Sequence, residues 1–183
     1  KVFKFKTMME LKYSEQVYSP REDSKLLKKV VEKYMHEFNP ARVLDMGTGS
    51  GIQAITAKKI YPDSEVVGVD INPMAVDLAE ENAKLNKVDI KFFVSDLFER
   101  FHNQKFDLII FNAPYLPSEP PIDPIWSGGE KFILKFIKLA REHLNFNGRI
   151  LFVYSSKSPV KFEHKVVAEE KVFFETLYVG EVR

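Results

Sequence analysis

Three glycines at every second position follow an apolar run in the segment VLDMGTGSGIQAI. They are Gly47, Gly49 and Gly51, and the run before them ends in Asp45. A strand, a glycine turn and a helix in this order let a backbone approach a ligand without a Cβ in the way. The third glycine comes one position too early for the fingerprint of a nicotinamide dinucleotide, which argues against that class of ligand.

Acidic residues follow the next two apolar runs of the sequence. Asp70 ends the run VVGVD, and Asp96 follows the run IKFFV closely. Because the carboxyl ends of parallel strands meet at one edge of a sheet, we expect Asp70 to accept hydrogen bonds from a ribose diol and Asp96 to accept one from an adenine amino group. The plain alternative is a strand, a turn and a helix with solvated carboxylates and no ligand.

The segment LIIFNAPYLP begins as a buried strand and then places Asn112, Ala113, Pro114 and Tyr115 at its end. An amide or aniline-like nitrogen is a poor nucleophile because its lone pair is delocalised, so a catalyst must bond both of its hydrogens and aim the lone pair. The side-chain oxygen of Asn112 and the backbone carbonyl of Ala113 can supply the two acceptors. Pro114 stiffens the segment, and Tyr115 offers a face on which a flat group can stack. The alternative is a proline turn that caps the strand.

Short β-like runs alternate with amphipathic helical stretches, which is typical of an α/β fold with a parallel sheet. We expect helices at residues 23–38, 51–60, 73–86 and 130–144. We expect strands at residues 42–46, 66–71, 90–94, 107–111 and 149–154. The long helix is expected to end near Asn147-Gly148, a C-cap signal, and the tail HKVVAEEKVFFETLYVGEVR is expected to form an antiparallel pair of strands.

Only nine residues, Ser155 to Glu163, separate the last of these strands from the tail. A parallel return to the sheet would need a right-handed crossover helix, and this segment is too short for one. Either the tail strand is antiparallel and connected by a loop, or residues are missing at this point, which is the alternative that we favour.

The composition excludes several kinds of site. The 183 residues contain 27 Lys and Arg against 26 Asp and Glu, so the bulk charge does not require a polyanionic partner. There is no cysteine, and the 4 histidines are scattered without ligand spacing, so we expect no disulfide and no metal. No apolar stretch approaches the roughly 18 residues of a membrane span. We therefore expect a single domain over residues 1–183, with a strand-like lead-in at residues 1–20, in a cytoplasmic protein.

Four segments together resemble the class I S-adenosylmethionine-dependent methyltransferases. They are LDMGTGSG, VDINPMAVDLAEENAKLN, SDLF and FNAPY, and the resemblance runs from about residue 18 to the C-terminus. Three features are similar to the HemK group, the glutamine methyltransferases of translation release factors: VYSPREDSKLL at residues 17–27, the Asn-x-Pro-Tyr pattern, and WSGGE at residues 126–130. The similarity extends especially to the short branch of this group, which has no N-terminal helical domain.

The resemblance implies a Rossmann-like, doubly wound, mostly parallel seven-stranded sheet with an antiparallel C-terminal strand, and S-adenosylmethionine as the cofactor. The sequence pattern and the resemblance together assign to the cofactor Asp45, Gly47, Thr48, Gly49, Ser50, Gly51, Asp70, Ile71, Asp96, Leu97, Asn112 and Ser24. By resemblance, Pro20, Glu22, Asp23 and Ser24 form a lip near the methionine end of the cofactor. The alternative is that Asp23 or Ser24 is the N-cap of the helix that follows.

The catalytic residues implied are Asn112, Ala113, Pro114 and Tyr115, where Ala113 departs from the proline that the family has at this position. We expect an N-methyltransferase acting on a planar amide or amine nitrogen, first of all the glutamine side chain of a release factor. The alternatives are an RNA or DNA methyltransferase acting on an exocyclic amine of adenine or guanine, and a cofactor-binding subunit without catalysis, which Ala113 alone suggests. The short branch also implies a small zinc-binding activator that extends the sheet along the strand at residues 90–94. No membrane partner is expected.

Overall fold

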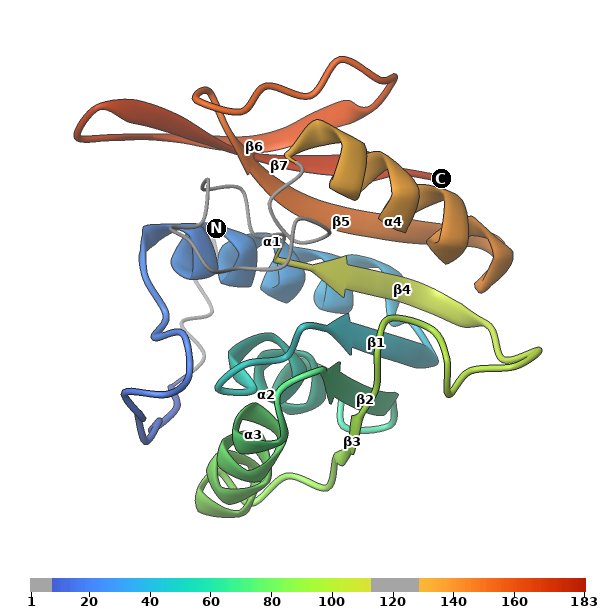
Figure 1. Ribbon diagram of the computed structural model, residues 1–183. Helices are drawn as coiled ribbons and strands as arrows, with labels where there is room; N and C mark the ends of the chain where they lie inside the picture. Colours follow the sequence, from blue (N-terminus) through green and yellow to red (C-terminus); the bar gives the residue numbers. More distant parts are fainter. Residues whose placement is uncertain (1–7, 113–128) are drawn as a thin grey trace, which may run out of the picture.

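A computed structural model describes residues 8–112 and 129–183 of the chain. Its strands form one seven-stranded sheet in the order β3-β2-β1-β4-β5-β7-β6 (Figure 1). The strands are β1 (Arg42–Met46), β2 (Glu65–Asp70), β3 (Lys91–Val94), β4 (Phe106–Phe111), β5 (Leu144–Ser155), β6 (Lys165–Val172) and β7 (Glu175–Val182). Neighbouring strands from β3 to β5 are parallel, and β7 is antiparallel to both β5 and β6. This confirms the predicted α/β fold with a Rossmann-like, mostly parallel sheet and antiparallel C-terminal strands.

Helices cover both faces of the sheet (Figure 1). Those in the described residues are α1 (Glu22–Phe38), α2 (Ile52–Ile60), α3 (Pro73–Leu85) and α4 (Glu130–Glu142). The first three pack on one face and α4 packs on the other. Side chains of a strand alternate between the faces, so Leu108 and Ile110 of β4 join the core under α1 to α3, whereas Ile109 and Phe111 join the core under α4. Burial on both faces explains why the parallel strands are continuous apolar runs in the sequence.

The predicted end of the long helix near Asn147-Gly148 is wrong. Helix α4 ends before this point, and β5 begins at Leu144. The register between β4 and β5 is irregular between Phe106 and Leu108, because a stretch of β5 bulges out of the ladder there. Asn147 has a φ of 61°. The Asn-Gly pair therefore accommodates a bulge inside a strand, a role that also favours residues tolerant of left-handed backbone.

The chain passes from β5 to β6 through a loop at residues 156–164 that contains no helix. Strand β7 lies between these strands and is antiparallel to both, so β6 runs parallel to β5 two places away. An extended chain spans up to about 3.3 to 3.6 Å per residue, which lets the loop reach the start of β6. Val160 and Phe162 of the loop pack against the core under α4, where a crossover helix would otherwise lie. The structure thus shows a loop connection, with β7 and not β6 as the antiparallel neighbour of β5, and the alternative that residues are missing here stays a prediction.

Residues 8–20 contain no strand, in contrast to the predicted strand-like lead-in, of which residues 1–7 lie outside the described residues. Two asparagines hold this irregular segment by its backbone. Asn82 in α3 accepts from the N–H of Lys12 (2.7 Å) and donates to the carbonyl of the same residue (3.1 Å). Asn86, the C-cap of α3, bonds both backbone groups of Glu10 in the same manner. The segment is thereby fixed along α3 before the chain enters α1.

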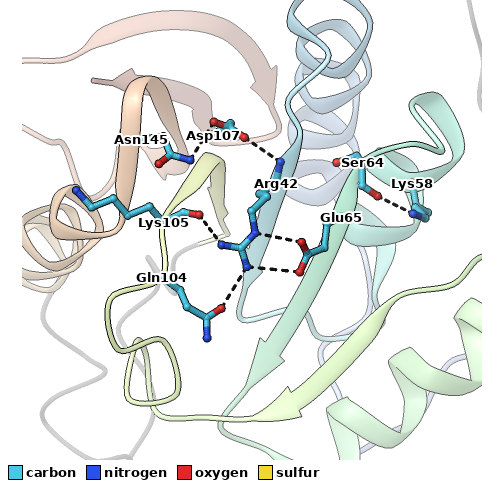
Figure 2. Close-up of polar contacts among 8 residues, drawn as sticks. All are labelled: Arg42, Lys58, Ser64, Glu65, Gln104, Lys105, Asp107 and Asn145. Atoms are coloured by element: carbon cyan, nitrogen blue, oxygen red, sulfur yellow. Dashed lines mark hydrogen bonds and ion pairs between the residues drawn. The ribbon is translucent and has the colours of Figure 1, made fainter.

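Polar contacts join the strands at the end of the sheet where the parallel strands begin (Figure 2). The guanidinium of Arg42 donates to both carboxylate oxygens of Glu65 (3.2 and 3.4 Å). It also donates to Gln104 Oε1 (3.2 Å) and to the carbonyl of Lys105 (2.8 Å). The backbone N–H of Arg42 donates to the Asp107 carboxylate (2.9 Å). One residue of β1 therefore connects β2 and the start of β4, at the end of the sheet opposite to the strand ends that carry the predicted site residues.

Candidate active site

A cavity of about 450 Å³ opens at the carboxyl ends of β1, β2 and β4, and its volume lies within the usual range of small-molecule sites. Predicted site residues that line it are Pro20, Asp23, Ser24, Asp45, Gly47, Thr48, Gly49, Ser50, Asp70 and Asn112. They come from the chain around the start of α1 and from the ends of three parallel strands. The parallel topology brings these strand ends to one edge, as open α/β sheets do at their ligand sites.

Other predicted site residues lie away from this cavity. Ile71 and Leu97 follow β2 and β3 without lining it, and Asp96 is exposed to solvent. Their assignment to the cofactor stays a prediction. The predicted residues Ala113, Pro114 and Tyr115, and residues 126–128 of WSGGE, lie outside the described residues.

The glycine turn after β1 uses backbone conformations that side chains rarely adopt. Gly49 has a φ of 53°, and a Cβ on it would meet no described atom within 4 Å, so the turn leaves open space beside the cavity. Gly51 has a φ of 87°, and a Cβ there would lie 3.2 Å from the Cβ of Ala79 in α3. The two glycines therefore have different roles. One keeps the turn open toward a ligand, and the other lets it pack closely on a helix.

Asp45 is buried at the end of β1 and accepts hydrogen bonds from Thr48 Oγ1 (2.8 Å) and from the N–H of Ala54 (3.1 Å). Burial raises the pKa of Asp45 to about 7, although both hydrogen bonds lower it, and the charge of Asp70 raises it further. The carboxyl group therefore titrates near neutral pH. A cation in the cavity would favour its ionised form.

Asp70 ends β2 and joins the glycine turn to the start of α3. Its Oδ2 accepts from the N–H of Gly49 (2.9 Å), and its Oδ1 accepts from the N–H of Asn72 (3.0 Å). Asn72 is itself the N-cap of α3, where its side chain accepts from the N–H of Met74 (3.0 Å). A carboxylate has about four acceptor positions, so Asp70 is held in place and still has lone pairs for donors in the cavity that it lines.

Asn112 follows β4, and its surroundings favour one orientation of its amide. Nδ2 donates to Ser24 Oγ (3.3 Å) and to Asp23 Oδ2 (3.5 Å), both on buried residues at the start of α1. Oδ1 is buried and has no hydrogen-bond partner in the part of the chain that the structure describes. A flipped amide would turn this oxygen against the Asp23 carboxylate, which electrostatic repulsion opposes. The oxygen is therefore the group that remains for a ligand.

Asp23 is fixed by several donors. Both of its oxygens lie 3.0 Å from the Tyr18 hydroxyl, and Oδ1 accepts from the N–H of Ser24 (2.7 Å). The predicted N-cap role of Asp23 or Ser24 is wrong, because Arg21 is the N-cap of α1 and makes no side-chain capping bond. Asp23 and Ser24 instead lie in the first turn of the helix, where they face Asn112 and the cavity.

Several residues that line the cavity were missed by sequence reasoning: Val17, Tyr18, Ile52, Gln53, Asn72 and Ala75. Gln53 is buried, and its Nε2 donates to the Ser24 carbonyl (2.9 Å), which ties α2 to the start of α1. No local pattern predicts such a contact between residues far apart in the chain. Asn72 did carry a signal, since an asparagine before a proline is typical of a helix start.

Two features are absent from residues 8–112 and 129–183. No group of three or more His, Asp or Glu side chains comes together there in a way that would hold a metal ion. None of the helices in these ranges combines the length and the apolar character that crossing a bilayer requires.

Residues 10–176 match the family described as methyltransferase small domain. A protein of Methanocaldococcus jannaschii, provisionally named a protein N5-glutamine methyltransferase, is 38% identical over an alignment of 190 positions, gaps included, that covers 93% of this chain and 93% of that protein. The release factor glutamine methyltransferase of Geobacter sulfurreducens is 39% identical over 102 residues, which cover 56% of this chain but only 35% of that enzyme. The crystal structure of a methyltransferase from Pyrococcus furiosus has a TM-score of 0.70 at 17% identity, over 94% of this chain and 88% of that one, which shows the same fold.

Proposed function

This chain belongs to the methyltransferase small domain family and is an S-adenosylmethionine-dependent methyltransferase, and from this premise we propose that it methylates the side-chain nitrogen of a glutamine in a translation release factor. The observation that carries the proposal is Oδ1 of Asn112 beside the cavity, which has no hydrogen-bond partner among the residues that the structure describes. A glutamine amide has two N–H groups, and its activation requires oriented acceptors for them. The names of the Methanocaldococcus and Geobacter relatives support a protein glutamine as the acceptor.

The residues of the cavity fit the cofactor. Asp70 is the proposed acceptor for the ribose hydroxyls, because it is held by two backbone donors and still has lone pairs to offer. The open turn at Gly49 leaves room beside it, and the carboxyl group of Asp45 suits a neighbouring positive charge. When bound, S-adenosylmethionine supplies a methyl group activated by its sulfonium. Ile71, Asp96 and Leu97 are proposed as outer contacts of the adenosine.

The proposed work of the protein is to hold the acceptor nitrogen. Asn112 Oδ1 accepts one N–H of the glutamine amide, while Asp23 and Ser24 keep the Asn112 amide in the required orientation. The carbonyl of Ala113 is the proposed second acceptor, and it lies outside the described residues. With both hydrogens bonded, the lone pair of the nitrogen points toward the methyl group. Holding reacting atoms about 3 to 3.5 Å apart supplies a large part of the acceleration of such a displacement.

Methyl-labelled S-adenosylmethionine tests the proposal when it is offered with an intact release factor, with transfer RNA and with duplex DNA in parallel reactions. We expect label in the release factor, located on a glutamine side chain by mass spectrometry. Asn112→Ala should lower this labelling by about 100-fold or more, the usual cost of losing one oriented group for the transition state. Asn145→Ala is the matched control, because Asn145 bonds Asp107 at the other end of the sheet (3.1 Å).

The same experiment distinguishes the alternative functions. Label in the nucleic acid and not in the release factor would favour an exocyclic-amine methyltransferase. Cofactor binding without label in any acceptor would favour a cofactor-binding subunit, the alternative that Ala113 suggests. The single-domain organisation and the cytoplasmic location stay predictions.

We also propose that a small zinc-binding activator pairs with β3. Besides the resemblance to the short HemK branch, the proposal is supported by the position of β3 at the edge of the sheet, where one side of the strand has no neighbouring strand within the described ranges. Val94 at the end of this strand is 43% exposed. Purification from the native source should yield a complex that contains zinc, and a zinc-free monomer would count against the partner.

A further inference from the structure

We propose that Phe173 and Phe174, at the tip of the β6–β7 hairpin, bind an apolar surface of the protein that carries the acceptor glutamine. The inference rests on the proposed function and adds to it the surface by which an intact protein substrate is selected. It depends on the exposure of the two rings, on the chemistry of the turn and on the position of the hairpin.

The two phenylalanines are among the most exposed large apolar side chains in the described residues, at 94% for Phe173 and 81% for Phe174. Their rings contact each other edge to face, with centroids 5.0 Å apart. Together they form a small apolar projection that the rest of the described chain leaves in solvent. Isolated exposed apolar residues are common on protein surfaces, but an adjacent aromatic pair at a sheet edge promotes association and so requires an explanation.

The turn itself gives no structural reason for phenylalanine. Val172 pairs with Glu175, so the hairpin is closed by only two residues, a length at which Gly, Asn and Asp with positive φ are strongly favoured. Neither phenylalanine has a positive φ. The sequence thus departs from local turn preference and exposes two aromatic rings at once. Departures of this kind, with no gain in packing, are expected where a residue is needed for function.

The hairpin points toward the side of the molecule where the acceptor must bind. Because β6 runs parallel to β5, its end lies at the same edge as the ends of β1, β2 and β4, and the tip projects beyond that edge (Figure 1). Ser155 at the end of β5 pairs with Leu177, so the hairpin continues past the last residue of β5. With strands about 4.8 Å apart and a rise of about 3.3 Å per residue, the tip lies on the order of 20 Å from Asn112.

At that separation a protein substrate can contact both Asn112 and the tip, whereas a small substrate at Asn112 would leave the tip unused. A standard protein interface buries about 800 Å² on each partner, a patch about 30 Å across, so one interface can include both the acceptor site and the tip. An extended peptide spans at most about 3.3 to 3.6 Å per residue, so a peptide with only two residues on each side of the glutamine cannot reach both places. The tip therefore selects the folded protein around the glutamine, and an aromatic pair is a typical anchor for such an interface.

The base of the hairpin is braced, which lowers the entropic cost of using it for binding. The N–H of Ser156 donates to the carbonyl of Thr176 (2.9 Å), and the N–H of Thr176 donates to Ser156 Oγ (2.9 Å). The hydroxyl of Ser155 also donates to the Glu175 carboxylate. These bonds connect the hairpin to the end of β5, next to the strand that carries Asn112. The rings are thus presented from a fixed position relative to the acceptor site.

The test compares the double variant Phe173→Ser, Phe174→Ser with the control Phe146→Ser. Phe146 is also 94% exposed but lies at the opposite end of the sheet, in the irregular part of β5. Each protein is assayed with an intact release factor and with a peptide from it that has only two residues on each side of the glutamine, too short to reach the tip. We expect kcat/KM of the double variant for the intact protein to fall by about tenfold or more through KM, as for an interface anchor, with the peptide rate and cofactor affinity unchanged.

Three kinetic results would overturn the inference. They are equal kcat/KM for the intact protein in wild type and double variant, an equal loss with the peptide, and an equal loss in Phe146→Ser. A change from dimer to monomer in sedimentation, with methylation of the intact protein unchanged, would assign the tip to a second copy of the chain and overturn it also. Failure of the proposed function is visible separately, because the wild type would then label neither release factor nor peptide.

Discussion

Replacing Asp23 by asparagine is expected to disable Asn112 without altering it. The oxygen of the new amide would keep the bond from the N–H of Ser24, the shortest contact of this carboxylate at 2.7 Å. Its NH₂ group would then face Nδ2 of Asn112, where a carboxylate oxygen now lies at 3.5 Å. Two donors cannot bond each other, so the Asn112 amide would flip and present Nδ2 instead of Oδ1 to the acceptor site.

The expected size of this effect follows from the contacts. The bonds to Nδ2 are long, at 3.3 and 3.5 Å, so neither is strong alone. The charge of Asp23 decides the orientation, because a buried acceptor left facing an oxygen costs about 1–3 kcal/mol. That preference corresponds to roughly a 10- to 100-fold change in the fraction of correctly oriented amide. We expect kcat of Asp23→Asn to fall by about the same factor.

Exchanging the two groups gives the decisive measurement. Asn112→Asp alone places two carboxylates side by side and should also lower kcat. In the double variant Asp23→Asn, Asn112→Asp, residue 23 donates and residue 112 again keeps an oxygen for the ligand, so kcat should recover in part. Single-turnover methyl transfer at saturating cofactor measures this. Calorimetry of cofactor binding is the control, because Asp23 lines the proposed cofactor cavity. If the free-energy losses of the single variants simply add in the double variant, the reasoning about amide orientation is refuted.

Three further predictions concern the cofactor and the stability of the sheet. Asp70→Ala should weaken S-adenosylmethionine binding by about 1–3 kcal/mol, because the ribose hydroxyls of the bound cofactor would lose the acceptor that two backbone N–H groups hold in place. Unchanged affinity in calorimetry would contradict the assignment. Asp45 has its pKa raised to about 7 by burial, and a cationic cofactor lowers that pKa on binding. The affinity for the cofactor should therefore rise with pH up to about 7 and level off above it, and binding below that pH should release protons. Calorimetry in buffers of different ionisation enthalpy measures both effects, and Asp45→Asn should remove them. Arg42→Met should lower the free energy of unfolding in urea by about 0.5–1 kcal/mol with cofactor affinity unchanged, because Glu65, Gln104 and the Lys105 carbonyl lose a donor (Figure 2). An unchanged urea midpoint would show that these exposed contacts contribute nothing.

The parts of the fold set by local pattern could be predicted from the sequence. The strand at residues 42–46 has its predicted bounds because four of its five residues are buried on the two faces of the sheet and a glycine turn marks its end. The helix end near Asn147-Gly148 was misplaced because an Asn-Gly pair suits a bulge as well as a C-cap, and only the pairing with β4 distinguishes them. Contacts between residues far apart in the chain could not be predicted either, because they too depend on how the helices and strands pack. Asn112 was predicted from its motif, but its fixation by Asp23 depends on α1 packing against the end of β4.

The position of β7 between β5 and β6 has a consequence for the order of folding. β6 comes before β7 in the chain, yet among the described strands β7 is its only neighbour, so β6 has no strand to join until β7 has formed. The two strands are joined by a turn of two residues, and such hairpins form in about 1–10 μs, long before distant strands usually meet. The pair is therefore expected to add to β5 as a preformed unit and to leave it as one. In hydrogen exchange, the amides of β6 should open no later than those of β7 that bond β5, since loss of the inner ladder releases both strands together.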